Sequence, residues 1–223
     1  MPNLKIIKYI ENIQNEISLY EGCEEITSIL CELKHSCIIK FYKNIKEPHI
    51  LKCLIKNGYK IDIDIIPHIM DNGIEMTKIL VEEGILNIDM IINIFTPLKH
   101  ATSNKDIQTV KYLLDKGANV NNYDIEYYTP LHIAVLNNDI EMIKLLLESG
   151  ADIDATTIDG ETPLHLNVLN DESYEIIELL LQQGADPLIK DEKRMTPLDH
   201  ARRYLDNTLI ELLEPYTINQ KHS

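Results

Sequence analysis

The sequence predicts an all-α solenoid of about six helix-turn-helix repeats with projecting finger loops, preceded by an N-terminal helical cap. Three observations support this prediction. The string Thr-Pro-Leu recurs at Thr96, Thr129, Thr162 and Thr196, with a period of 33 or 34 residues. Amphipathic helical patterns that end in glycine recur at the same period, and a short polar segment follows each glycine. Copies of one helical unit stack on one another and bury a continuous apolar interior.

Each clear unit opens with a helix at its Thr-Pro pair. The threonine hydroxyl caps the helix N-terminus, and proline is tolerated at the first helical position because its missing N–H would have no partner there. In the unit that starts at Thr129, a second helix is expected over Ile140 to Leu147, where apolar residues recur at helical spacing. Gly150 then ends this helix, because glycine readily takes the left-handed conformation.

The third part of each unit is a projecting finger. Between Gly150 and Thr162 the sequence is short and polar, and it contains the pair Asp159-Gly160, which is typical of a tight turn. One unit is therefore two helices plus a finger.

These strings resemble a known repeat family. TPLHIA begins at Thr129, TPLHLN begins at Thr162, and LLLESGADID and LLLQQGADPL begin at Leu145 and Leu179. They resemble the ankyrin repeat, whose 33-residue period and T-P-L-H-x-A signature they match from about residue 96 to residue 214. The resemblance implies that partners dock on a concave face made by the finger tips and the exposed side of each first helix. It also implies a structural role for the histidine of TPLH.

The repeat phase extends backwards, because Gly84 and Gly117 are 33 residues apart and Gly58 follows a similar helical pattern. On this phase we divide the chain into an N-terminal helical cap at 1–36, a degenerate ankyrin-like repeat without a finger at 37–62, a degenerate ankyrin repeat at 63–95, ankyrin repeats at 96–128, 129–161 and 162–195, a C-terminal capping repeat at 196–215 and a flexible tail at 216–223. We expect Pro215 to end the last helix.

The unit at 162–195 departs from the pattern in two ways. Asn167 takes the position held by Ala101, Ala134 and Ala201, and a buried amide is expected to find hydrogen-bond partners. The unit is also one residue longer, and we expect the extra residue to lengthen the loop between its helices, near residues 171–174.

Composition excludes several classes of protein. Apolar runs fall far short of the roughly 20 residues that span a bilayer, and Glu11 and Glu16 interrupt any signal-peptide core, so we expect an intracellular, cytoplasmic protein. Cys23, Cys31, Cys37 and Cys53 lack CxxC spacing and are expected to be free thiols. Cys31 and His35 give zinc only one pair of ligands, so no metal or cofactor is expected.

The chain has a formal net charge of -15, and the charge is unevenly distributed. Residues 1–62 carry 9 Lys or Arg against 8 Asp or Glu, whereas residues 63–223 carry 12 against 28. An acidic surface repels phosphate backbones, so nucleic acid is not an expected ligand, whereas a basic protein segment would be attracted. The simpler interpretation is that these carboxylates only solvate the outer helix faces.

No catalytic constellation is evident. His132 and His165 hold the same place in adjacent units, and helices stacked about 8 to 10 Å apart keep equivalent imidazoles from sharing one metal. Neither a Gly-rich phosphate loop nor a G-x-S-x-G elbow is present. The sequence therefore predicts a protein without enzymatic activity.

The candidate binding surface follows from alignment with the concave face of ankyrin proteins. Its predicted residues are Phe95, Ile125, Glu126, Tyr128, Leu136, Asn137, Ile158, Asp159, Glu161, Leu169, Asn170, Glu192, Lys193 and Met195. We call its large apolar members the concave stripe: Phe95, Tyr128, Leu136, Ile158, Leu169 and Met195. Such a stripe with an acidic rim is typical of a protein-binding surface. Alternatively, some of these side chains pack onto neighbouring fingers. Tyr123 and Tyr127 lie on one finger and extend the candidate surface, or Tyr127 only shields the backbone.

The sequence thus favours a monomeric, non-enzymatic adaptor that binds a protein partner on its concave face. A second hypothesis is a host-directed effector or inhibitor from an intracellular pathogen or virus, which occludes a basic segment of a host regulator. The 36 Ile and 18 Asn against 7 Ala and 3 Arg indicate the AT-rich genome that such organisms often have. A third hypothesis places a small enzymatic or ligase-recruiting element in residues 1–62, where the cysteines lie.

Overall fold

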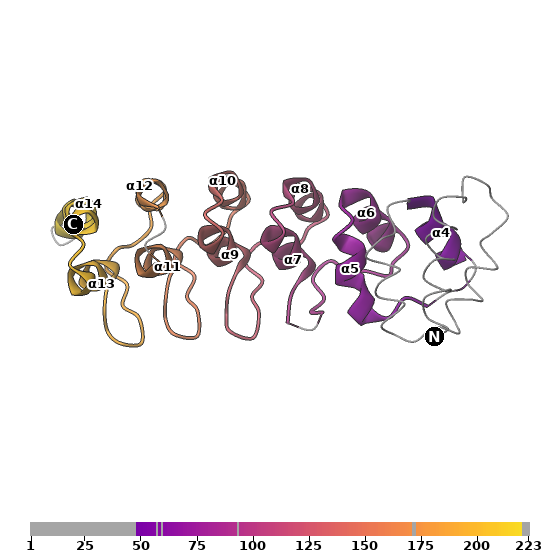
Figure 1. Cartoon of the computed structure of the whole chain (residues 1–223), viewed down its shortest axis with the longest axis horizontal. Helices are drawn as coiled ribbons and strands as arrows, with labels where there is room; N and C mark the ends of the chain where they lie inside the picture. Colours follow the sequence, from indigo (N-terminus) through magenta and orange to yellow (C-terminus); the bar gives the residue numbers. More distant parts are fainter. Residues whose placement is uncertain (1–47, 57, 59, 93, 171–172, 220–223) are drawn as a thin grey trace, which may run out of the picture. The chain divides into compact units, whose positions relative to one another are not determined.

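The computed structural model describes residues 48–56, 58, 60–92, 94–170 and 173–219, and the regular secondary structure of these residues is helical (Figure 1). The chain divides into two compact units, Met1–Asn93 and Ile94–Ser223, which are described separately. The predicted cap at 1–36 and the first part of the repeat at 37–62 lie outside the described residues. The all-α prediction is confirmed.

In the first unit, helix α6 contacts both α4 and α5. The described elements of this unit are α4 (Pro48–Lys56), the short 3-10 helix η1 (Ile63–Ile65), α5 (Ile66–Met70) and α6 (Ile74–Glu82). Leu51, Ile65 and Leu80 are fully buried among them. This repeat has no Thr-Pro pair: η1 begins at Ile63, its N-cap residue Asp62 makes no side-chain cap hydrogen bond, and the helix α5 that follows is short.

Cys53 lies half-buried in α4 and is disulfide-bonded. The expectation of a free thiol is therefore wrong for this residue. The spacing of the cysteines in the sequence did not predict this bond, because disulfide pairing depends on which cysteines the fold brings within bonding distance. Cys23, Cys31 and Cys37 lie outside the described residues.

The second unit consists of four helix pairs in two rows (Figure 1). Its helices are α7 (Pro97–Ser103), α8 (Ile107–Asp115), α9 (Pro130–Leu136), α10 (Ile140–Glu148), α11 (Pro163–Asn170), α12 (Tyr174–Gln182), α13 (Pro197–Tyr204) and α14 (Asn207–Asn219). Each of α7, α9, α11 and α13 packs against the helix that follows it, and these four also pack against one another in order. The loops after α8, α10 and α12 project beyond the first-helix row, away from the second-helix row.

The sequence explains where each first helix begins. Thr129 and Thr162 accept hydrogen bonds from the backbone N–H groups of His132 and His165, at 3.5 and 3.3 Å. Thr96 and Thr196 cap α7 and α13 in the same way. The predicted Thr-Pro caps are confirmed. The second helices α8 and α10 have an aspartate cap that sequence analysis did not single out, Asp106 and Asp139.

The predicted glycine stops are also confirmed. Gly117, Gly150 and Gly184 follow the second helices with φ of 89°, 87° and 96°, in the left-handed region where a side chain is strained. Their equivalent in the first unit, Gly84, has φ of 67°.

The last helix runs past the predicted boundary. Helix α14 contains Pro215 and continues to Asn219, so the expected stop at Pro215 is wrong, and residues 216–219 belong to a helix rather than to the predicted flexible tail. Leu213 and Thr217 are buried on this helix, and the Thr217 hydroxyl donates to the Glu214 carbonyl at 2.9 Å. This packing offsets the missing proline N–H.

The longer unit differs from expectation too. Helix α11 has eight described residues where α7 and α9 have seven, and the predicted longer loop near 171–174 includes residues 171 and 172, which lie outside the described residues. Asn167 is 1% exposed, and neither polar atom of its side chain has a hydrogen-bond partner among the described residues. The expectation that this buried amide finds partners is therefore wrong. Burial of an amide without such a hydrogen bond destabilises the folded state.

Candidate functional site

Three fingers of the second unit share one backbone design. We name them the first finger (residues 118–128), the second finger (151–161) and the third finger (185–195). In the first, the Asp124 N–H donates to the Tyr128 carbonyl at 3.2 Å, and the Tyr127 N–H donates to the Asp124 carbonyl at 3.0 Å. Equivalent pairs of hydrogen bonds close the other two tips. Each tip is therefore a tight turn with its own internal support.

Backbone hydrogen bonds also join neighbouring fingers. The Ile158 N–H donates to the Glu126 carbonyl at 3.0 Å, and the Glu192 N–H donates to the Asp159 carbonyl at 2.9 Å. At Gly160 a side chain has no room, because an added Cβ would lie 3.0 Å from the backbone nitrogen of Glu192. The three tips are thus held in a fixed register, so their outward side chains form a preorganised surface.

The TPLH histidines tie the fingers to the first helices. The Nδ1 atoms of His132 and His165 accept the N–H of Thr129 and Thr162 at 3.1 and 3.2 Å. Their Nε2 atoms donate to carbonyls at the base of the following finger, those of Glu161 at 3.3 Å and Met195 at 3.1 Å. Burial lowers the pKa of His132 to about 4 and also lowers the pKa of His165, so both rings are neutral at pH 7. The predicted structural role is confirmed.

In the flanking unit at 96–128, Lys99 replaces the TPLH histidine and forms a buried ion pair with Asp124 of the first finger. Burial by itself would raise the pKa of Asp124, but hydrogen bonds from Lys99 and from two backbone N–H groups bring it below its usual value. The Lys99 ammonium also lies 5.4 Å from the ring centre of Phe95 and 5.8 Å from that of Tyr128. This finger is therefore fixed by charge and by cation–π contacts.

In the last unit Asp199 takes the histidine position and completes a capping box with Thr196. The neighbouring His200 reaches the third finger, where its Nε2 atom lies 2.6 Å from Asp191 Oδ2. Both side chains are almost completely buried. Burial would raise the pKa of Asp191, but the Met195 N–H and His200 lower it below its usual value. The third finger is thus held from two repeats, by His165 at Met195 and by His200 at Asp191.

The predicted surface residues divide into two groups by exposure. Ile125 and Ile158 are 68% and 59% exposed, and the rest of the exposed group consists of Glu126, Asp159, Asn170, Glu192 and Lys193. The half-buried group consists of Phe95, Tyr128, Leu136, Asn137, Glu161, Leu169 and Met195. Five of the six members of the concave stripe are therefore half-buried, and Ile158 alone of the six is exposed.

Contacts within the repeats explain part of this burial. The ring of Phe95 is tilted against His100 at 6.3 Å between centres, and the ring of Tyr128 meets His132 edge-on at 5.7 Å. The Asn137 side chain donates to the carbonyls of Thr102 and Ser103 in the preceding unit, at 3.3 and 3.4 Å. These residues help to join the repeats, as the alternative interpretation expected for some of them.

Tyr123 and Tyr127 form the most exposed aromatic pair on the fingers. Their rings stack with centres 4.8 Å apart and an angle of 16° between planes, and they are 50% and 46% exposed. Tyr127 has φ of 62° at the turn position that Gly160 occupies in the second finger. The sequence placed both tyrosines on one finger, but their stacking follows only from the folded turn.

The electrostatic environment of the tips is negative. Burial raises the pKa of Tyr128, and the carboxylates of Glu161, Glu126 and Asp159 raise it further. Burial and the nearby Asp159 likewise raise the pKa of Glu161. Carboxylates of the first and second fingers therefore create a shared negative potential around Tyr128 and Glu161. This potential favours a cationic ligand group.

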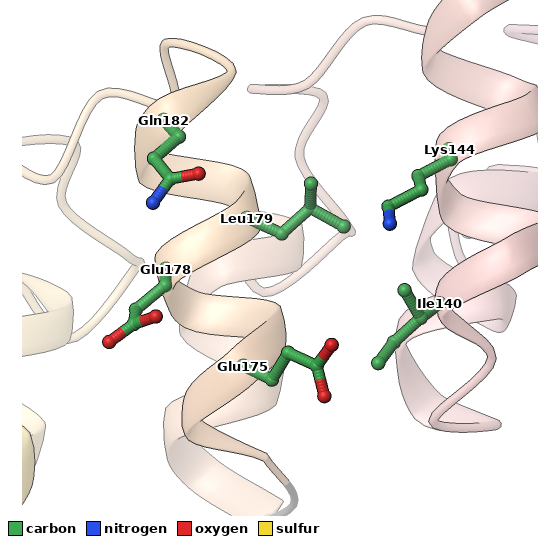
Figure 2. Close-up of a pocket in the computed structure, with 6 residues that line it drawn as sticks. All are labelled: Ile140, Lys144, Glu175, Glu178, Leu179 and Gln182. Carbon is green, nitrogen blue, oxygen red and sulfur yellow. The ribbon is translucent and has the colours of Figure 1, made fainter.

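A small hollow lies between second helices, on the side away from the fingers (Figure 2). Ile140 and Lys144 of α10 face Leu179 and Glu175 of α12 across it. Its volume of about 140 Å³ is below the roughly 300 Å³ at which small-molecule pockets begin. We therefore place the candidate site on the finger side.

Two absences concern only the part of the chain that the structure describes. Over that part, no helix is long and apolar enough to cross a membrane. No group of three or more His, Cys, Asp or Glu side chains there is arranged to hold a metal ion.

A family model described as "Ankyrin repeats (3 copies)" matches residues 38–124 and 121–191, which is more than half of the chain. The chain belongs to the ankyrin repeat family. Ankyrin repeats are protein–protein interaction modules, and the family is generally non-enzymatic. No curated protein matches this ankyrin repeat chain. The matched regions include the fingers at 118–128 and 151–161, which hold six of the fourteen predicted surface residues.

Proposed function

We propose that this ankyrin repeat protein is a non-enzymatic adaptor that binds a protein partner on the finger side of its second unit. The observation that carries the proposal is the fixed register of the fingers, which presents Ile125 and Ile158 to solvent beside carboxylates. Apolar anchors on a rigid support lose little conformational freedom when a partner binds. In this proposal the protein acts in the cytoplasm as a monomer and needs no cofactor.

The test uses exposed residues, because substitution of the half-buried stripe would also disturb packing. Wild-type protein and an Ile125→Asp, Ile158→Asp variant are used for affinity capture from lysate, and the captured partner is then purified and titrated. The matched control is Tyr174→Asp, at an exposed tyrosine that begins α12 in the second-helix row. We expect binding to wild type and control, and at least tenfold weaker binding to the double variant. Equal binding to all three would reject the finger side as the working surface.

A second candidate is an inhibitor that covers a basic segment of a host regulator. The negative environment around Tyr128 and the excess of carboxylates in residues 63–223 favour it. Such binding weakens as salt rises, because screening acts on exposed charges. Titration of the purified partner at 50 and 300 mM salt separates the candidates: steep weakening favours the inhibitor, and an unchanged affinity favours an apolar adaptor contact. The enzymatic or ligase-recruiting element proposed for residues 1–62 stays a prediction.

A further inference from the structure

The stacked pair Tyr123 and Tyr127 is a candidate subsite that the adaptor function does not by itself require. The two rings lie nearly parallel with centres 4.8 Å apart, and about half of each residue is exposed. Each ring can cover only one face of the other. An exposed aromatic pair of this kind offers flat apolar area that loses few rotamers on binding.

The left-handed backbone conformation at Tyr127 is unfavourable for an aromatic residue. The finger turn needs a left-handed residue here, as Gly160 with φ of 74° and Arg194 with φ of 61° show in the other two fingers. Glycine adopts this conformation without strain, whereas a side chain with a Cβ is disfavoured in it. Tyr127 nevertheless keeps φ of 62° while its ring stays half exposed. Strain without compensating burial points to a use of the ring at the surface.

The charges near the pair select the kind of ligand. Glu126 directly precedes Tyr127 in the chain, and its carbonyl accepts the Ile158 N–H of the second finger. The carboxylates of Glu126, Asp159 and Glu161 all raise the pKa of Tyr128, the residue that follows Tyr127. The described first finger contains no Lys or Arg, and the nearby Lys99 is already paired with Asp124. An aromatic face beside carboxylates attracts a planar cation, because a guanidinium stacks on the ring and donates hydrogen bonds to the carboxylate.

We propose that Tyr123 and Tyr127 form a stacking platform for an arginine side chain of the partner protein, with Glu126 as the acidic group beside it. The proposal rests on the proposed function and adds the chemistry of one contact. An ammonium group fits less well, because lysine presents a compact, strongly hydrated charge that cannot stack. Nucleic-acid bases also stack on tyrosine, but the acidic tips repel the phosphates that would come with them.

The experiment measures fluorescence anisotropy of two labelled peptides with the full-length protein. One peptide alternates arginine with glycine and serine, and the other has lysine in place of every arginine. We expect wild type to bind the arginine peptide about three- to tenfold more tightly, the size of effect expected from one cation–π stack. Tyr127→Gly removes the ring and leaves a residue that suits the turn, so it should bind both peptides equally. Tyr174→Ala, at an exposed tyrosine in α12, should keep the wild-type preference.

Three results with the peptides would overturn the platform: no binding of either peptide by wild type, equal binding of both by wild type, or an arginine preference that survives in Tyr127→Gly. Binding of single-stranded oligouridine in place of the arginine peptide would also overturn it. Tyr127→Asn is the second variant if the glycine variant does not fold, because asparagine tolerates the left-handed conformation. If the platform fails while partner binding still depends on Ile125 and Ile158, the adaptor function stands without it.

Discussion

The two central repeats and the two flanking repeats fix the fingers by different chemistry. In the central units, His132 and His165 are buried neutral rings that bridge a threonine N–H and a finger carbonyl. In the flanking unit at 96–128 this task falls to the charged pair of Lys99 and Asp124, whereas in the last unit, which has no finger of its own, His200 contacts Asp191 of the third finger.

The fingers are therefore held in place by two kinds of interaction, and the stability that each provides responds differently to mutation and to pH. A neutral imidazole is buried at small electrostatic cost when both nitrogens are hydrogen-bonded, but it resists protonation. A buried ion pair tolerates its charges only while both partners are present. We therefore expect the free energy of unfolding to fall when one charge of the Lys99–Asp124 pair is removed. We also expect the stability of the central repeats to depend on pH.

Removal of one partner of the flanking ion pair should give the largest effect. Lys99→Met leaves the Asp124 carboxylate buried without its cation, and we expect the free energy of unfolding to fall by about 3 to 5 kcal/mol. Urea unfolding measures this loss. The double variant Lys99→Met, Asp124→Asn is the control, since the amide oxygen can still accept the N–H groups of Glu126 and Tyr128, and it should recover most of the loss. A loss below about 1 kcal/mol in the single variant would contradict a stabilising buried pair.

Acid should destabilise the central repeats by a smaller amount. Because the pKa of His132 is about 4 in the folded protein against 6.5 for the free group, the unfolded chain binds more protons between these values. The contribution of His132 is fully present above about pH 6.5 and is lost as the pH falls towards 4. Between pH 7.5 and 5 we expect the free energy of unfolding to fall by about 2 kcal/mol on account of this residue.

The measurement compares urea unfolding of wild type and His132→Gln at these two pH values. The variant lacks the titrating ring, so the difference between its two values should be smaller than in wild type. The pKa of His165 is also lowered by burial, so the variant should keep part of the dependence. Equal pH dependence in both proteins would show that the pKa of His132 is not depressed.

The smallest effect concerns a difference between the two central repeats. Asn167 stands where the neighbouring unit has Ala134, and its buried amide has no hydrogen-bond partner among the described residues. Asn167→Ala should raise the free energy of unfolding by about 1 kcal/mol, because it removes an uncompensated polar group and favours the helix. The reverse change, Ala134→Asn, should lower it by about 1 to 3 kcal/mol. Destabilisation by Asn167→Ala would instead indicate that the amide makes a contact essential to α11.

Part of the candidate site could be predicted from sequence and part could not. Alignment placed Ile125, Ile158 and Asp159 at exposed finger tips, because their register with the Thr-Pro helix start repeats in every unit. It left open whether Tyr128 and the other members of the concave stripe are exposed or packed, since contacts such as that of Tyr128 with His132 come from a neighbouring repeat. Stacking of Tyr123 on Tyr127 depends on the left-handed turn between them.

By itself, the sequence determined the all-α repeat architecture, the helix starts at Thr-Pro and the helix stops at glycine. These features depend on local hydrogen bonds and backbone sterics, which a few adjacent residues settle. Only the tertiary structure decided that Lys99 pairs with Asp124, that α14 continues through Pro215 and that Asn167 is buried without a hydrogen-bond partner in the described part of the chain. Each of these depends on residues brought together from different elements, whose packing outweighs local preference and is not encoded in a local pattern.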